Sequence, residues 1–227
     1  MNTFTRISAA VGMILITGGL VACGNVSVTP PAAPDSASLP IPPTEPAAVP
    51  GWAAILGDTS APEGWQAVPC ENPILLCVSA DSELMGTVER ASYPLSDIDL
   101  AADVEPIPGS ELEFLRAWVA EHYAAIEGDR QTADSSLVFS TEPPTEISVG
   151  GLPGLRYSFG ATRPNGALFD RYVGYVATDG ELLHIFVTGI IPGDTAGVFS
   201  DSAALEQFEP HLDDIIRGLS LASEERI

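Results

Sequence analysis

Three consecutive runs rich in apolar and aromatic residues, at residues 155–161, 168–178 and 181–188, carry the clearest β-strand pattern in the chain. The dipeptides Asn165-Gly166 and Asp179-Gly180 separate the runs, and both favour two-residue hairpin turns. Similar runs at 65–68, 74–79, 87–93 and 137–140 predict further strands. We therefore predict an antiparallel sheet of about six or seven strands.

Two other segments have the three-to-four-residue apolar spacing of amphipathic helices. The first is expected over 111–126, where Ser110 and Glu113 form a capping box. The second is expected from about Pro210, because proline suits the first turn of a helix. Helices packed against an antiparallel sheet make an α+β fold, so we predict a sheet sandwiched by helices.

A candidate site follows from the register of the three central strands. If both turns have two residues, one face carries apolar residues such as Leu155 and Val176 and is expected to be a core face. The opposite face brings Arg156, Tyr175 and His184 into one cross-strand row, a candidate ligand-binding patch for a carboxylate, phosphate or glycan. The alternative is that a helix covers Tyr175 and His184, while Arg156 reaches past it to solvent.

The N-terminus has the pattern of a lipoprotein signal. Residues 1–22 contain one cation, Arg6, and then an apolar run, so we predict a signal peptide. It ends at Leu20-Val21-Ala22-Cys23, a pattern that predicts lipidation of Cys23. Two or three acyl chains would anchor the protein outside the cytoplasm, on the cell membrane or the outer membrane. An uncleaved helical anchor is the alternative.

The rest of the chain divides by composition. Residues 28–50 hold eight of the 20 prolines, so 23–51 is expected to be the lipidated cysteine and a semi-extended linker. Residues 52–222 are long enough for one domain with a sizeable core, and 223–227 are a short tail.

The charge narrows the range of partners. The formal net charge is −22, and removal of Arg6 with the signal leaves 8 basic against 31 acidic residues, or −23. All nine basic residues are arginine. Such a charge disfavours binding to nucleic acid. The acids Asp97, Asp99, Asp103 and Glu105 lack the glycine and final glutamate of an EF-hand loop, so we expect a solvated loop, with a cation site as the alternative.

The remaining cysteines, Cys70 and Cys77, predict a disulfide in an oxidising compartment. The chain has no glycine-rich phosphate loop, no G-x-S-x-G motif and no His-x-x-x-His pair. We therefore expect no enzyme activity, no cofactor and no metal site.

The chain also resembles a known fold family. The segments that carry the resemblance are Gly151-Leu152-Pro153-Gly154-Leu155-Arg156-Tyr157-Ser158-Phe159, Tyr172-Val173, Leu183-His184-Ile185-Phe186 and Ile215-Ile216-Arg217-Gly218-Leu219. Over about residues 60–222 it resembles the PsbP-like fold family, including the LpqN-like lipoproteins of actinobacteria. The resemblance implies an α/β/α sandwich that acts as a non-catalytic binding or assembly module at a membrane surface, with a role in photosystem II assembly if the source is cyanobacterial.

An envelope protein or a glycan is the expected partner. A carrier of a small ligand in a cleft between sheet and helix is the alternative function, and a hydrolase is the third.

Overall fold

The computed structural model describes residues 51–57, 61, 63–100, 109–193, 199 and 201–221. All of them belong to one compact unit, Val49–Ile227. The predicted signal peptide, Cys23, the linker before Gly51, Asp103, Glu105 and the tail 223–227 lie outside the described residues. Among the helices that are described, none is long and apolar enough to span a membrane.

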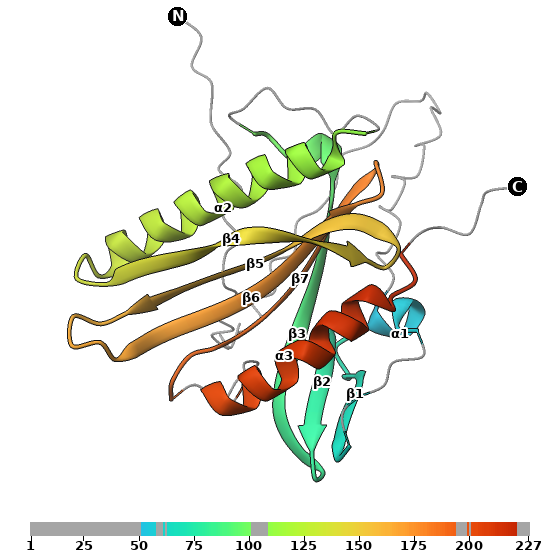
Figure 1. The fold of residues 1–227 in the computed structure, drawn as a ribbon, viewed down its shortest axis with the longest axis horizontal. Coiled ribbons are helices and arrows are strands. Elements are labelled where there is room, and N and C mark those ends of the chain that lie inside the picture. Colours follow the sequence, from blue (N-terminus) through green and yellow to red (C-terminus); the bar gives the residue numbers. More distant parts are fainter. Residues whose placement is uncertain are drawn as a thin grey trace, which may run out of the picture. The chain divides into compact units, whose positions relative to one another are not determined.

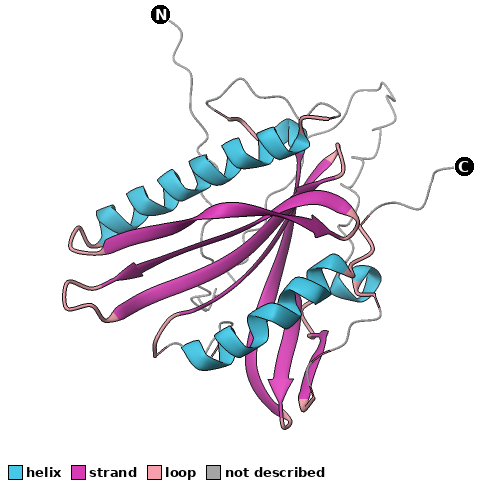
Figure 2. Ribbon diagram, in the orientation of Figure 1, coloured by secondary structure: helices cyan, strands magenta, loops and turns pink. Residues whose placement is uncertain are grey.

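In the described part of the chain, seven strands form one antiparallel sheet (Figures 1 and 2). They are β1 (Trp65–Pro69), β2 (Leu75–Ala80), β3 (Glu83–Pro94), β4 (Val138–Val149), β5 (Leu152–Thr162), β6 (Leu168–Thr178) and β7 (Leu182–Ile190). Their order across the sheet is β1-β2-β3-β7-β6-β5-β4. Two sets of consecutive strands, β1–β3 and β4–β7, therefore meet where β3 pairs with β7. The predicted antiparallel sheet is confirmed.

Helices lie on both faces of this sheet, as predicted. They are α1 (Trp52–Ile55), α2 (Glu111–Ala133) and α3 (Ser202–Arg217), with a short 3-10 turn, η1 (Leu95–Asp97). Figure 1 shows α2 running along β4 and β5, and α3 crossing the sheet with α1 near its C-terminal end. A backbone hydrogen bond of 2.8 Å from Ser220 N–H to the Ile55 carbonyl ties α1 to the chain just after α3.

Both helices begin or end away from the predicted positions. The first continues to Ala133, and the Ser110 side chain makes no capping hydrogen bond, so the predicted capping box is wrong. The second begins eight residues before Pro210, at Ser202, because Asp201 is the N-cap and its side chain accepts a hydrogen bond from Ala204 N–H at 2.7 Å. Pro210 therefore lies inside the helix, where it lacks the donor that an ordinary residue provides.

Two hydrophobic clusters fill the two faces. The α2 cluster contains Phe114, Leu115, Trp118, Val119, Leu155, Tyr157, Phe159, Val176, Leu183 and Ile185. The α3 cluster includes Trp52, Leu76, Val78, Val88, Val173, Tyr175, Phe186, Phe199, Leu205, Phe208, Leu212 and Ile216. The predicted core face is confirmed by the α2 cluster. The opposite face, where we placed the candidate patch, is a second core face.

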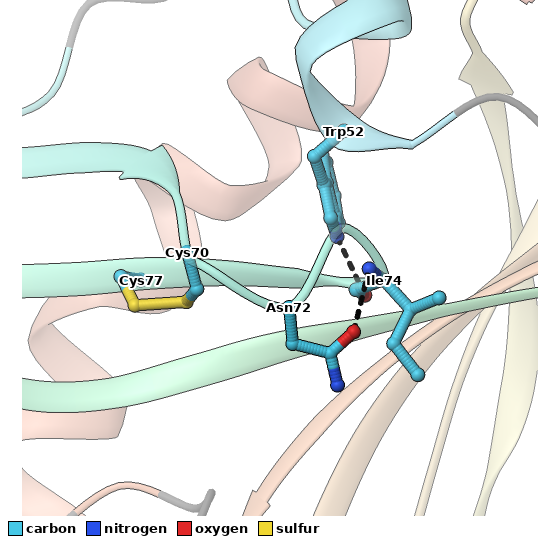
Figure 3. Close-up of a disulfide and its surroundings, with 5 residues drawn as sticks. All are labelled: Trp52, Cys70, Asn72, Ile74 and Cys77. Atoms are coloured by element: carbon cyan, nitrogen blue, oxygen red, sulfur yellow. Dashed lines mark hydrogen bonds between the residues drawn. A yellow bond between two sulfur atoms is a disulfide. The ribbon is translucent and has the colours of Figure 1, made fainter.

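The predicted disulfide is present. Cys70 and Cys77 are bonded, with a Cα–Cα distance of 5.2 Å, inside the usual range for disulfides. Figure 3 shows the bond at the turn between β1 and β2, close to Asn72 and Ile74. The bond therefore fixes the end of β1 to its neighbour.

Candidate functional site

The predicted cross-strand row is only half right. Arg156 of β5 lies opposite Tyr175 of β6, as predicted. Tyr175, however, lies opposite Phe186 of β7, and His184 lies opposite Ala177. The β6–β7 register is thus shifted by two residues from the prediction, and the single row of Arg156, Tyr175 and His184 is wrong.

The cause of the shift is the turn after β6. The carboxylate of Asp179 accepts hydrogen bonds from the N–H groups of Glu181 at 2.9 Å and Leu182 at 2.8 Å. These bonds organise a turn longer than the two-residue hairpin that Asp179-Gly180 predicted. Because the shift is an even number of residues, every side chain keeps its predicted face.

Arg156 and Tyr175 are held by α3. The Tyr175 side chain is fully buried, and its hydroxyl donates to Asp213 Oδ1 at 2.6 Å. Arg156 lies 3.5 Å from Asp213 and 3.3 Å from Glu209. Burial raises the pKa of Tyr175, and the hydrogen bond to Asp213 raises it further, so this phenol is a neutral donor. The alternative in which a helix covers the patch therefore describes Tyr175 correctly.

Arg171 extends the same network along the sheet. Its Nη2 lies 2.6 Å from Glu209 Oε1, so Glu209 sits between two guanidinium groups. Burial is the main reason that the pKa of Glu209 is raised, although both arginines act against the rise. Arg156 and Arg171 are thus paired with two acids of α3, Glu209 and Asp213.

His184 belongs to a separate cluster. Its side chain is 4% exposed, with Nδ1 3.0 Å from Ser92 Oγ and Nε2 3.1 Å from Asp179 Oδ2. Burial lowers the pKa of His184, and Arg90 adds to this effect against the opposing pull of Asp179. His184 therefore links β7 to β3 and to the turn after β6, and it does not join Arg156 in one patch.

An open space lies on the same face of the sheet, over β4, β5 and β6. We call it the β4–β6 hollow; its volume is about 310 Å³. Its polar lining includes Ser140, Glu142, Ser158, Thr162 and Arg171. Ser158 Oγ donates to Glu142 Oε2 at 2.6 Å.

A glycine helps to create this space. Gly160 lies between Ser140 of β4 and Arg171 of β6 in the ladder. A Cβ atom at this position would come within 2.7 Å of the Asp170 carbonyl oxygen, so a side chain does not fit there without a shift of the backbone. The sheet surface between the two neighbouring side chains therefore stays empty.

The hollow offers both donors and acceptors. Arg171 Nη1 is a buried donor with no hydrogen-bond partner among the described residues. Glu142 and the hydroxyl side chains supply acceptors. This combination suits a ligand that carries hydroxyl groups.

Sequence reasoning missed the acids that complete the network. Glu209 and Asp213 are four residues apart, so they lie on one side of a helix and could have been matched to two arginines on one sheet face. That signal was hidden because the helix was predicted to begin only at Pro210. Glu142 was missed because the predicted strand stopped at residue 140.

No metal centre is evident in the described part of the chain, where no three His, Cys, Asp or Glu side chains are grouped to hold an ion. Asp97 and Asp99, which were candidates for a cation loop, lie at and just after η1. The Asp97 carboxylate accepts a hydrogen bond from Ser96 Oγ at 3.1 Å.

Comparisons with known proteins give little beyond the fold. No protein-family model matches the chain, and no curated protein matches it. Among solved structures, it is similar to the solution structure of cyanobacterial PsbP (CyanoP) from Synechocystis sp. PCC 6803. The match covers 74% of this chain and 92% of that chain, with 9% identity and a TM-score of 0.41. At this level no residue role is transferred from that protein.

Proposed function

We propose that this protein is a lipid-anchored, extracytoplasmic binding module without catalytic activity, and that the β4–β6 hollow binds a neutral, hydroxyl-rich ligand such as a cell-envelope glycan. The observation that carries the proposal is the lining of the hollow. Arg171 lines it together with Glu142, Ser140 and Ser158. Sugar hydroxyls both donate and accept, so they match such a lining.

The charge balance argues for a neutral ligand over an anion. Arg156 and Arg171 are already paired with Glu209 and Asp213. A carboxylate or phosphate would therefore compete with these acids in a chain whose net charge is −22. Of the three ligand classes considered for the face that carries Arg156, the glycan fits this electrostatic setting best.

Membrane attachment is the second part of the proposal. The signal pattern ending at Cys23 supports a lipid anchor, and the proline-rich residues that follow would let the domain reach a ligand away from the bilayer. The sequence resemblance supports placing the chain with the LpqN-like lipoproteins. In this setting the hollow would hold an envelope component close to the membrane.

Glycan binding can be tested with a small panel of probes. Oligomers of N-acetylglucosamine and neutral hexose oligomers would be titrated into the full chain in detergent, with two-dimensional NMR as the readout. We expect shifts at Ser158, Gly160 and Arg171 for at least one probe. Arg171→Gln should weaken its binding by about tenfold, the effect of losing a charged hydrogen bond.

The matched control is Arg217→Gln, because Arg217 has a half-exposed side chain and pairs with acids on α3 itself. Its affinity should equal that of the unchanged protein. Failure of every glycan to bind, or equal binding by Arg171→Gln, would contradict the proposed ligand.

The anchor is tested separately. A Cys23→Ser chain should lose incorporation of radioactive palmitate and leave the membrane fraction of the cells. Membrane retention of Cys23→Ser would favour the uncleaved helical anchor instead.

A further inference from the structure

The two edge strands of the sheet, β1 and β4, differ in how well they are protected from pairing with a further strand. At β4, Pro143 and Pro144 lie where the register with β5 shifts, between Glu142 and Thr145. The Tyr123 hydroxyl of α2 also donates to the Glu142 carbonyl at 3.0 Å. Prolines, a bulge, charged residues and a covering helix are the usual means of preventing an edge strand from pairing further.

The edge at β1 has no such protection among the described residues. Its sequence, Trp-Gln-Ala-Val-Pro, carries no charge and has a proline only at its last position. Cys70 N–H donates inward to the Leu75 carbonyl at 3.0 Å. By the alternation of an antiparallel ladder, the N–H groups of Trp65 and Ala67 then point outward. In the described part of the chain, no hydrogen bond reaches them.

This edge is also held rigidly in place. The disulfide fixes its C-terminal end to β2, and Trp52 Nε1 donates to the Ile74 carbonyl at 2.9 Å, as Figure 3 shows. Trp65 stacks on Phe208 of α3, with 5.5 Å between ring centroids. A strand that is ordered in advance binds a partner at a lower entropic cost.

The surface next to this edge is apolar and acidic. Val68 and Leu84, which are 50% and 57% exposed, lie on the same face by register. Five acids around them are exposed and take part in none of the ion pairs found among the described residues: Glu63, Glu71, Asp81, Glu83 and Glu89. The only cation within residues 51–100 is Arg90, which is 4% exposed.

We propose that β1 accepts an extended, basic segment of a partner protein as an added strand. Backbone bonds to Trp65 and Ala67 would give affinity, as in other cases of strand addition, and the surrounding acids would select cationic side chains. A second copy of the chain would bring its own excess of acids to the contact. The chain's own residues 24–50 contain no cation, so they do not match this charge.

This surface is distinct from the β4–β6 hollow, because β1 and β4 are opposite edges of the sheet. The protein would then bring together a protein segment and a glycan, each on its own end of one sheet. The inference does not depend on glycan binding.

The test uses the full chain in detergent and two fluorescent peptides, one of alternating arginine and valine and one with glutamate in place of arginine. Fluorescence anisotropy would measure binding at low and high salt. We expect the arginine peptide alone to bind, more weakly at high salt. Ala67→Pro should weaken binding by about tenfold, because it removes an outward N–H group without a ladder bond to β2.

A second variant tests the proposal without a change in the backbone of β1, so that misfolding of Ala67→Pro cannot explain a loss of binding. The double variant Glu71→Gln, Glu83→Gln should bind the arginine peptide about threefold to tenfold more weakly, and its binding should depend less on salt. Its control, Glu113→Gln with Asp129→Asn, makes the same change in net charge on α2 and should bind as the unchanged protein does.

Amide hydrogen exchange completes the test. The N–H groups of Trp65 and Ala67 should exchange fast in the free full chain and slowly with the arginine peptide. Slow exchange without peptide would mean that another part of the chain, or a second copy, covers the edge, and it would overturn the proposal. Equal binding of the two peptides would overturn the proposal as well. So would equal affinity of the Ala67→Pro variant and the unchanged protein for the arginine peptide.

Discussion

The two hydrophobic clusters differ in the strands that they join. The described strand residues of the α2 cluster come from β5, β6 and β7, which follow one another in the chain. The α3 cluster takes Leu76, Val78 and Val88 from β2 and β3, and Val173 and Phe186 from β6 and β7. Helix α2 thus packs on one strand set, whereas α3 holds both sets together.

The charged side chains next to the two clusters differ as well. Beside the α2 cluster, Arg130 pairs with Asp170 at 2.6 Å and lies 5.2 Å from the centre of the Phe159 ring. Beside the α3 cluster, Arg156 and Arg171 share the acids of α3. A helix that crosses two strand sets covers less of each, and this leaves room for the β4–β6 hollow next to charged groups. The candidate site therefore lies on the face that also holds the domain together.

The largest effect should come from the aromatic centre of the α3 cluster. Phe208 is fully buried and packs against Trp65 and Phe199. Phe208→Ala should lower the free energy of unfolding by about 3–5 kcal/mol, as measured by urea denaturation. Hydrogen exchange should rise most in β1–β3, because these strands lose their link to the second set.

Leu115→Ala in the α2 cluster is the matched comparison. It should lower the free energy of unfolding by about 2–5 kcal/mol. It should also raise the rate of hydrogen exchange in β5–β7 more than in β1–β3. The same exchange pattern in both variants would mean that the two clusters do not divide the strands in this way.

The second prediction concerns His122, which stacks on Trp118 at 4.8 Å and meets the edge of Tyr157. Burial, with help from Arg130, lowers its pKa from 6.5 to about 4. Between these values the unfolded chain binds a proton that the folded chain does not, so stability should fall as pH drops from about 6.5 to about 4, by up to about 3 kcal/mol.

His122→Phe should make stability less dependent on pH in that range, and NMR should find the His122 pKa far below 6.5 in the unchanged protein. A titration near 6.5 would contradict the packing of His122 against Trp118 and Tyr157. His184 acts in the same direction, since burial also lowers its pKa, so part of the dependence should remain in the variant.

The third prediction tests the ion pairs between α3 and the sheet. Glu209→Gln leaves Arg156 and Arg171, whose side chains are 22% and 29% exposed, with less compensation. We expect a loss of about 2 kcal/mol at neutral pH, less than for fully buried pairs because some solvent reaches both groups. An unchanged urea midpoint would mean that the network contributes nothing to stability.

The smallest effect is expected at Arg116, which pairs with Glu146 on the outer side of α2 and β4. Its side chain is 48% exposed and that of Glu146 is 61% exposed. Arg116→Gln should change stability by less than about 0.5 kcal/mol, because water screens such pairs. A larger loss in the same urea experiment would mean that this pair helps to hold α2 on the β4 edge.

Much of the sheet could be predicted, because alternation and turn residues are local signals. The run 168–178 matches β6 at both ends, and the Arg156–Tyr175 pairing was predicted correctly. The predicted two-residue turn at Asn165-Gly166 is wrong, however, because Arg163 N–H donates to the Ala167 carbonyl around a loop of three residues, and a bulge after Ala161 restores the register. The β6–β7 register could not be predicted in the same way. It depends on hydrogen bonds from the backbone to the side chain of Asp179. The dipeptide Asp-Gly alone does not show whether these bonds form, so it does not determine the length of the turn.

The candidate site was harder to predict, since it forms only when distant segments meet. Arg156 and Arg171 were placed on one face, but their acids lie on a helix whose start was predicted too late. The hollow depends on the absence of a side chain at Gly160 and on the path of α3 across the sheet. Neither follows from the periodicity of a single segment.

The pairing of β3 with β7 has a consequence for folding kinetics. Every other strand pair is a hairpin between consecutive strands, whereas Glu89 and Val187 of this pair are far apart in the chain. Closing so long a loop is slow relative to forming hairpins. We expect the two strand sets to form early, and the joining of β3 to β7, with α3 packing across it, to set the rate at which the domain folds.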